Sequence, residues 1–69
     1  MKPSVAVVFQ MMLDTMAKAT SKQDLDTLDS FLGGLLTGAV AYNDITHTEH
    51  RAACGRQAEA YERAVVKWQ

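Results

Sequence analysis

The chain has 69 residues, enough for a single domain spanning residues 1–69 but for only a small hydrophobic core. Seven basic and eight acidic side chains give a formal net charge of −1. This balance argues against non-specific binding to nucleic acid or to an anionic membrane surface, because both require a clear excess of basic residues.

The first predicted helix covers residues 4–19 and follows Pro3, whose missing N–H is not needed in a first helical turn. Val7 and Met11 lie four positions apart on its polar side, where we expect them to touch each other and to point away from the core. This small excess apolar patch indicates a surface that contacts another molecule. The core face carries apolar residues at helical spacing: Val5, Val8, Phe9, Met12, Leu13 and Met16.

The same segment has some features of a secretory leader, since an apolar run precedes a cleavage-like motif at 17–19. Gln10 interrupts that run and Asp14 follows it closely, so we expect no leader. The run is also shorter than the roughly 20 residues that a membrane-spanning helix needs.

The second predicted helix covers residues 22–42, with Ser21 as its N-cap and Asp24 in its first turn. Its core face is a broad stripe: Leu25, Leu28, Leu32, Leu35, Leu36 and Ala39. The stripe keeps its phase across Gly33-Gly34, which favours a continuous helix although each interior glycine costs up to about 1 kcal/mol relative to alanine. The opposite side has little side-chain bulk: Thr27, Ser30, Gly34, Thr37, Gly38 and Ala41.

This small-residue strip permits the close approach of another helix. The sequence leaves open whether that helix belongs to the same chain or to another molecule, or whether the glycines end the second helix early. We include Ser30, Gly34 and Gly38 among the residues expected to contact a partner.

A turn signal at 42–44 and a capping box formed by Thr46 and Glu49 predict a third helix over residues 47–67. Its expected inner face consists of His50, Cys54, Ala58, Tyr61, Val65 and Trp68. Three amphipathic helices joined by short turns predict an all-α fold, a small antiparallel three-helix bundle whose core self-association would complete. The expected core contains Val8, Phe9, Met12, Leu13, Met16, Leu25, Leu28, Leu32, Leu35, Leu36, Cys54, Tyr61, Val65 and Trp68.

Zinc-ligand side chains recur on one face of the third helix at His47, His50 and Cys54. Asp44 is the nearest fourth ligand, and the spacing matches no closed structural zinc motif, so we expect neither a metal nor another cofactor. His50 and Cys54 also have the spacing of a nucleophile and its base, but catalysis needs a third, orienting group and a pocket for which this chain has little room. We therefore expect that the protein is not an enzyme.

Cys54 is the only cysteine, so no internal disulfide can form. A single cysteine is typical of a protein in a reducing compartment, and we expect a cytoplasmic location.

The chain has no catalytic motif, is marginal in size, and carries more apolar and small-residue surface than its own core needs. These features predict a non-enzymatic protein–protein interaction module that forms a homodimer or another homo-oligomer. This short, capped, helical chain with one cysteine resembles small accessory proteins of bacteriophages and plasmids. The resemblance implies a regulatory or inhibitory role in which the protein binds and occludes a host protein. The residues expected to bind the partner are Val7, Met11, Ser30, Gly34, Gly38, Arg56 and Arg63.

Two alternative functions stay open. One is a metal-dependent regulator that uses His47, His50 and Cys54. The other is a DNA-binding regulator whose third helix reads the duplex, although Arg56 and Arg63 alternate there with acidic residues, which is typical of a solvated face. In the leading interpretation we expect a protein partner and no nucleic acid, membrane or small-molecule substrate.

Overall fold

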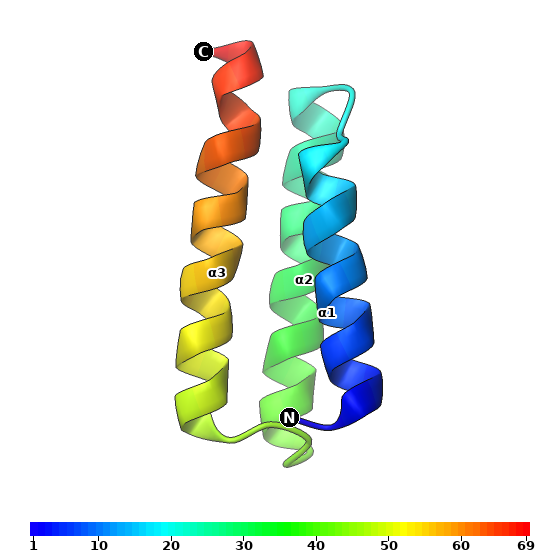
Figure 1. The fold of residues 1–69 in the computed structure, drawn as a ribbon, viewed down its shortest axis with the longest axis vertical. Coiled ribbons are helices and arrows are strands. Elements are labelled where there is room, and N and C mark those ends of the chain that lie inside the picture. Colours follow the sequence, from blue (N-terminus) through cyan, green and yellow to red (C-terminus); the bar gives the residue numbers. More distant parts are fainter.

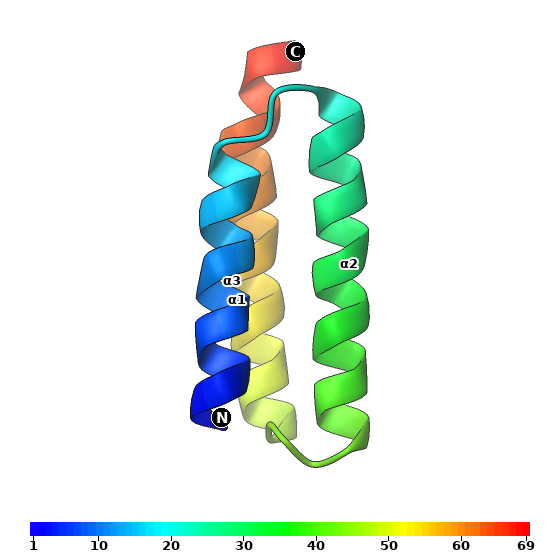
Figure 2. The same ribbon diagram turned by 90° about the vertical axis from the view of Figure 1, so that its right-hand side faces the viewer.

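Three helices follow one another along the chain: α1 (Pro3–Ala17), α2 (Lys22–Ala41) and α3 (His47–Val65), with the short 3₁₀ helix η1 (Val66–Trp68) after the last. The computed structural model describes residues 1–69 and contains no strand. The helices run up, down and up again, and each packs against both others in a bundle of 36 × 17 × 15 Å (Figures 1 and 2). The predicted all-α antiparallel three-helix bundle is confirmed.

The predicted helix boundaries differ from the structure mainly at the carboxyl ends. α1 ends at Ala17 rather than at residue 19, because the chain must reverse before Ser21, which adopts the extended backbone of an N-cap (φ −149°, ψ 159°). α2 continues through its paired glycines to Ala41, as the phase of the leucines predicts. α3 ends at Val65, and the next three residues tighten into η1.

Side-chain caps set the starts of α2 and α3. Thr46 and Glu49 form the predicted capping box, with hydrogen bonds of 3.0 Å from Glu49 N–H to Thr46 Oγ1 and 2.9 Å from Thr46 N–H to Glu49 Oε1. At α2, Ser21 Oγ accepts the N–H of Asp24 at 3.0 Å. The Asp24 carboxylate instead accepts the Thr20 hydroxyl at 3.0 Å, since aspartate is one methylene shorter than the usual glutamate.

Ten residues are buried, and five of their side chains are almost completely enclosed: Phe9, Met16, Leu25, Leu32 and Leu36. Most of the other predicted core residues are half-buried around them. Val8 is an exception, because α1 directs Phe9 and Met16 into the centre of the core and leaves Val8 at the edge, 43% exposed. Its assignment to the core was wrong.

The predicted inner face of α3 was also wrong in part, because the helix is rotated about its axis. Cys54 and Ala58 are exposed, whereas Ala53 and Ala64 are buried. The buried side of α3 therefore carries the small side chains of Ala53 and Ala64 beside Val65, which suits dense packing against α1 and α2.

Polar side chains connect α2 to α3 beside this core. The Tyr61 hydroxyl donates to Asp26 Oδ1 at 2.6 Å, and Gln57 Nε2 donates to the Asp29 backbone carbonyl at 3.0 Å. Lys22 Nζ donates to the second oxygen of the Asp26 carboxylate at 2.9 Å. These contacts orient the flank of α2 that faces α3, and the outer side of α2, turned away from both α1 and α3, has no neighbouring helix (Figure 2).

Candidate functional site

The half of the α1–α2 hairpin nearest the N-terminus carries no charged side chain. Between Pro3 and Leu13, and again between Ser30 and Asn43, the chain contains no Lys, Arg, Asp or Glu. Because α1 and α2 are antiparallel neighbours, the two segments lie side by side at one end of the bundle (Figure 1). We call the exposed side chains of residues 3–13 and 30–43, except Gln10, which faces α3, the uncharged face.

Large hydrophobic side chains are concentrated on this uncharged face. Seven remain exposed in the whole molecule, and five of them belong to the two uncharged segments: Val7, Val8, Met11, Phe31 and Tyr42. Phe31 is 67% exposed, Met11 62% and Val7 59%. A phenylalanine exposed to this extent within a charge-free surface is typical of a contact surface.

Met11 and Phe31 lie at the same level on the two walls of the α1–α2 groove. Thr15 and Thr27 line one depression where the two helices meet. Met11 is one helical turn before Thr15, and Phe31 is one turn after Thr27. Since the helices are antiparallel, one turn back on α1 and one turn forward on α2 reach the same height.

The small-residue strip of α2 faces outward, which answers the question that the sequence left open. Ser30 and Gly34 are exposed, and Gly38 is half-buried. A Cβ atom added at Gly34 or Gly38 would meet no other atom within 4 Å, so neither glycine packs against another helix of the chain. Together with Phe31, the strip forms a shallow depression lined by Thr27, Ser30, Phe31, Gly34 and Leu35.

Sequence reasoning missed Phe31, although a signal for it was present. The residue lies one turn after Thr27 and three positions before Gly34, and so belongs to the small-residue side of α2 rather than to the leucine stripe. An aromatic residue on a strip otherwise free of bulk was the signal that could have marked this flank as a candidate contact surface.

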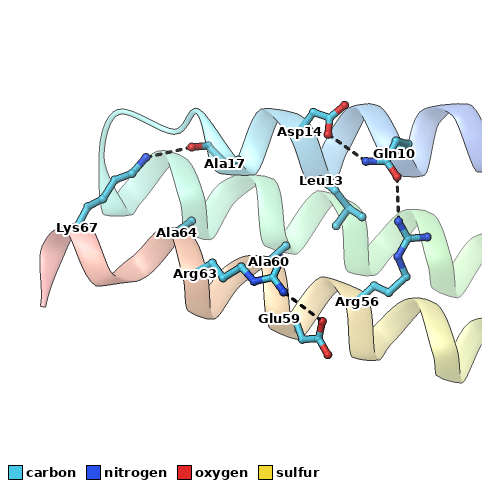
Figure 3. A pocket seen from close by; sticks show the side chains of 10 residues that line it. All are labelled: Gln10, Leu13, Asp14, Ala17, Arg56, Glu59, Ala60, Arg63, Ala64 and Lys67. Carbon is cyan, nitrogen blue, oxygen red and sulfur yellow. Dashed lines mark hydrogen bonds and ion pairs between the residues drawn. The ribbon is translucent and has the colours of Figure 1, made fainter.

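Arg56 and Arg63 belong to a different surface, the groove between α1 and α3 (Figure 3). This groove has a volume of about 340 Å³. Arg56 Nη2 donates to Gln10 Oε1 at 2.9 Å, and its guanidinium lies 5.1 Å from the centre of the Phe9 ring. Arg63 makes only a long contact of 3.9 Å with Glu59 and is therefore the freer of the two cations.

The groove has mixed charge, with basic side chains along α3 and acidic ones on both walls. Lys67 Nζ donates to the Ala17 carbonyl at 3.0 Å, and Gln10 Nε2 donates to Asp14 Oδ1 at 3.0 Å, so part of its hydrogen-bonding capacity is used within the chain. Such a groove suits a polar protein contact better than a phosphate backbone, because acidic side chains lie among the cations.

The candidate metal and nucleophile residues do not assemble into a site. Cys54 Sγ lies 3.7 Å from His50 Nε2, and both side chains are near the surface. No group of three His, Cys, Asp or Glu side chains is placed to hold an ion, so His47 does not join the other two. His50 has no hydrogen-bonding side-chain partner besides Cys54, and hence lacks the orienting group of a catalytic dyad.

The seven predicted partner-binding residues thus divide between two surfaces. Val7, Met11, Ser30, Gly34 and Gly38 belong to the uncharged face, and Arg56 and Arg63 line the α1–α3 groove. No helix is both long enough and apolar enough to cross a lipid bilayer. No protein-family model, curated protein or solved structure matches the chain.

Proposed function

We propose that this protein is a non-enzymatic interaction module, a small regulatory or inhibitory accessory protein that acts by binding another protein and occluding its surface. One observation carries the proposal: the uncharged face exposes Phe31, Met11 and Val7 to solvent. An inhibitory role of the phage or plasmid type, and a cytoplasmic location, belong to the same proposal.

The energetics of exposed apolar side chains support binding at this face. Burying a phenylalanine or methionine side chain contributes roughly 1.5–3 kcal/mol. The chain has few other sources of stability, with only ten buried residues, yet it leaves these side chains in water. Contact with another protein surface would recover that free energy, and without charged neighbours no ion would need to be desolvated.

The α1–α3 groove would add specificity to such contacts. Arg63 is 83% exposed and its only ion pair is the long one with Glu59, so its guanidinium is available to a carboxylate of the partner. The groove is a surface separate from the uncharged face, so it would give the partner a second, polar contact.

Affinity capture with a matched pair of variants tests the proposal. Tagged wild-type protein, Phe31→Glu and Val66→Glu are used to capture proteins from the cells that naturally contain this chain. Val66 is a suitable control because it is 60% exposed but lies in η1, away from the uncharged face. We expect Phe31→Glu to weaken retention of the partner by at least about tenfold, and Val66→Glu to retain it. Equal retention by all three proteins, or no retained protein at all, contradicts the proposal.

A further inference from the structure

We propose that the α1–α3 groove binds an acidic helical segment of the partner protein, whose carboxylates, seven residues apart, contact Arg56 and Arg63. The inference rests on the proposed function and deepens it, since it names the chemistry of the second, polar contact. Three of the chain's seven basic side chains line this groove and only two of its eight acidic ones do, so the local charge is positive although the whole chain carries −1.

Arg56 is a positioned cation without a counter-ion. Its guanidinium lies 5.1 Å from the centre of the Phe9 ring, and its Nη2 donates to Gln10 Oε1 at 2.9 Å. None of the four ion pairs of the chain includes Arg56. A guanidinium has five N–H donors, so the ring and the amide hold Arg56 in place while donors remain for a carboxylate. Because the side chain is already ordered, binding an anion there costs less conformational entropy.

Gln10 separates Arg56 from the acidic side chain of the opposite wall. Its Oε1 accepts from Arg56, and its Nε2 donates to Asp14 Oδ1 at 3.0 Å (Figure 3). The amide therefore bridges the guanidinium and the Asp14 carboxylate, which form no ion pair with each other. An incoming carboxylate is favoured on the α3 side of the groove, where the cations lie, and disfavoured beside Asp14 on the α1 side.

Arg63 supplies the second contact. Its side chain is 83% exposed, and its one ion pair, with Glu59, is 3.9 Å long. An exposed pair of this length contributes little to stability, so a carboxylate of the partner can replace it with two parallel N–H···O bonds. Lys67 adds a third positive charge where it spans one end of the groove to reach the Ala17 carbonyl (Figure 3).

The spacing of the two arginines fits a helix as the occupant. Arg56 and Arg63 are seven residues apart on α3, which places them about 10.5 Å apart along its axis and about 20° apart around it. A second helix alongside α3 has the same rise, so two of its residues seven apart reach both guanidiniums from one face. Side chains on one face of an extended strand lie about 6.6 or 13 Å apart, and match this separation less well.

The apolar lining of the groove suits the same occupant. It consists of one leucine and three alanines: Leu13, Ala17, Ala60 and Ala64. Small side chains allow another helix to approach closely, and an apolar residue between the two carboxylates would pack against Leu13. The expected segment is therefore amphipathic, with acidic side chains towards α3 and small or apolar ones towards the floor.

Two synthetic helical peptides of identical composition test the proposal, with binding measured by fluorescence anisotropy. Each has about 18 residues, long enough to form a helix, and is built on alanine and glutamine with one leucine and two glutamates. The glutamates are seven residues apart on one face of the first peptide, and five apart on different faces of the second. We expect the first peptide to bind the wild-type protein at least about tenfold more tightly than the second.

Three variants locate the binding. Arg63→Glu and Arg56→Gln should each lose at least about tenfold in affinity for the first peptide. Arg51→Glu is the matched control, because Arg51 is also exposed on α3 but lies outside the groove, and it should retain the affinity. Circular dichroism separates lost binding from lost folding.

Equal affinity for the two peptides, no binding, or a similar loss in Arg51→Glu overturns the proposal. A DNA duplex that binds as tightly as the first peptide, and is released by Arg63→Glu, also overturns it by assigning the groove to phosphate. If the peptides fail while capture of a protein still depends on Phe31, the groove proposal is rejected and the proposed function stands.

Discussion

Asn43 shows how one residue sets the reversal between α2 and α3. It is the single non-glycine residue with a positive φ, 60°. Its N–H donates to the Val40 carbonyl at 3.2 Å, and the next N–H, of Asp44, donates to the Ala39 carbonyl at 2.8 Å. These two bonds form a Schellman motif, which satisfies the last carbonyls of α2 and requires the left-handed conformation that asparagine tolerates.

We expect Asn43→Ala to lower the free energy of unfolding by about 1 kcal/mol, because a Cβ without a locally bonding side chain disfavours positive φ. Asn43→Gly should be at least as stable as the wild type, since glycine adopts this conformation without steric cost. Urea denaturation followed by circular dichroism measures both changes. Equal stability of the alanine and glycine variants would show that the left-handed backbone is not the source of the effect.

At the scale of elements, the contact between α2 and α3 depends on a shared carboxylate. The hydrogen bond from the Tyr61 hydroxyl, followed by that from Lys22, holds the pKa of Asp26 below its ordinary value. The same Asp26 contact raises the pKa of Tyr61 and that of Lys22. These shifts mean that the ionised aspartate and the protonated tyrosine are the forms that the folded state prefers.

This linkage predicts a pH window for stability. The ionised Asp26 contributes to the stability of the fold above about pH 3.9, the ordinary pKa of aspartate. This stabilisation is lost as the pH falls through the lower pKa that Asp26 has in the folded state. The protonated Tyr61 contributes to stability below about pH 10, the ordinary pKa of tyrosine. This stabilisation is lost as the pH rises through the raised pKa that Tyr61 has in the folded state. We therefore expect the melting temperatures of wild type and Asp26→Ala to differ most near neutral pH and to converge in acid.

Tyr61→Phe provides the companion variant, because it removes the hydroxyl while keeping the ring against the core. It should lose stability near neutral pH and should show a smaller further loss above pH 10 than the wild type. A pH-independent difference between Asp26→Ala and the wild type would mean that packing, rather than the carboxylate, connects the helices.

At the scale of the whole molecule, stability rests on very few side chains. A core of this size rarely supplies more than roughly 3–5 kcal/mol. Leu32 lies at the middle of α2 and is fully enclosed, and truncating such a residue to alanine costs roughly 2–5 kcal/mol. One core substitution is therefore comparable with the entire free energy of unfolding.

We expect Leu32→Ala to leave most of the chain unfolded at 25 °C, and Leu28→Ala, which truncates a half-buried residue, to cost less and stay folded. Thermal unfolding followed by circular dichroism distinguishes the two. A folded Leu32→Ala protein would mean that the free energy of unfolding exceeds what a core of this size supplies.

The sequence alone determined the three helices, the capped starts of α2 and α3 and the continuity of α2 through Gly33, because hydrophobic spacing and caps such as Thr46 act over only a few residues. Only the tertiary structure decided how each helix is rotated about its axis. That rotation depends on packing between helices, which placed Ala53 rather than Cys54 on the buried side of α3 and brought Met11 level with the unpredicted Phe31. The uncharged face therefore became visible only when residues distant in the chain were assembled side by side.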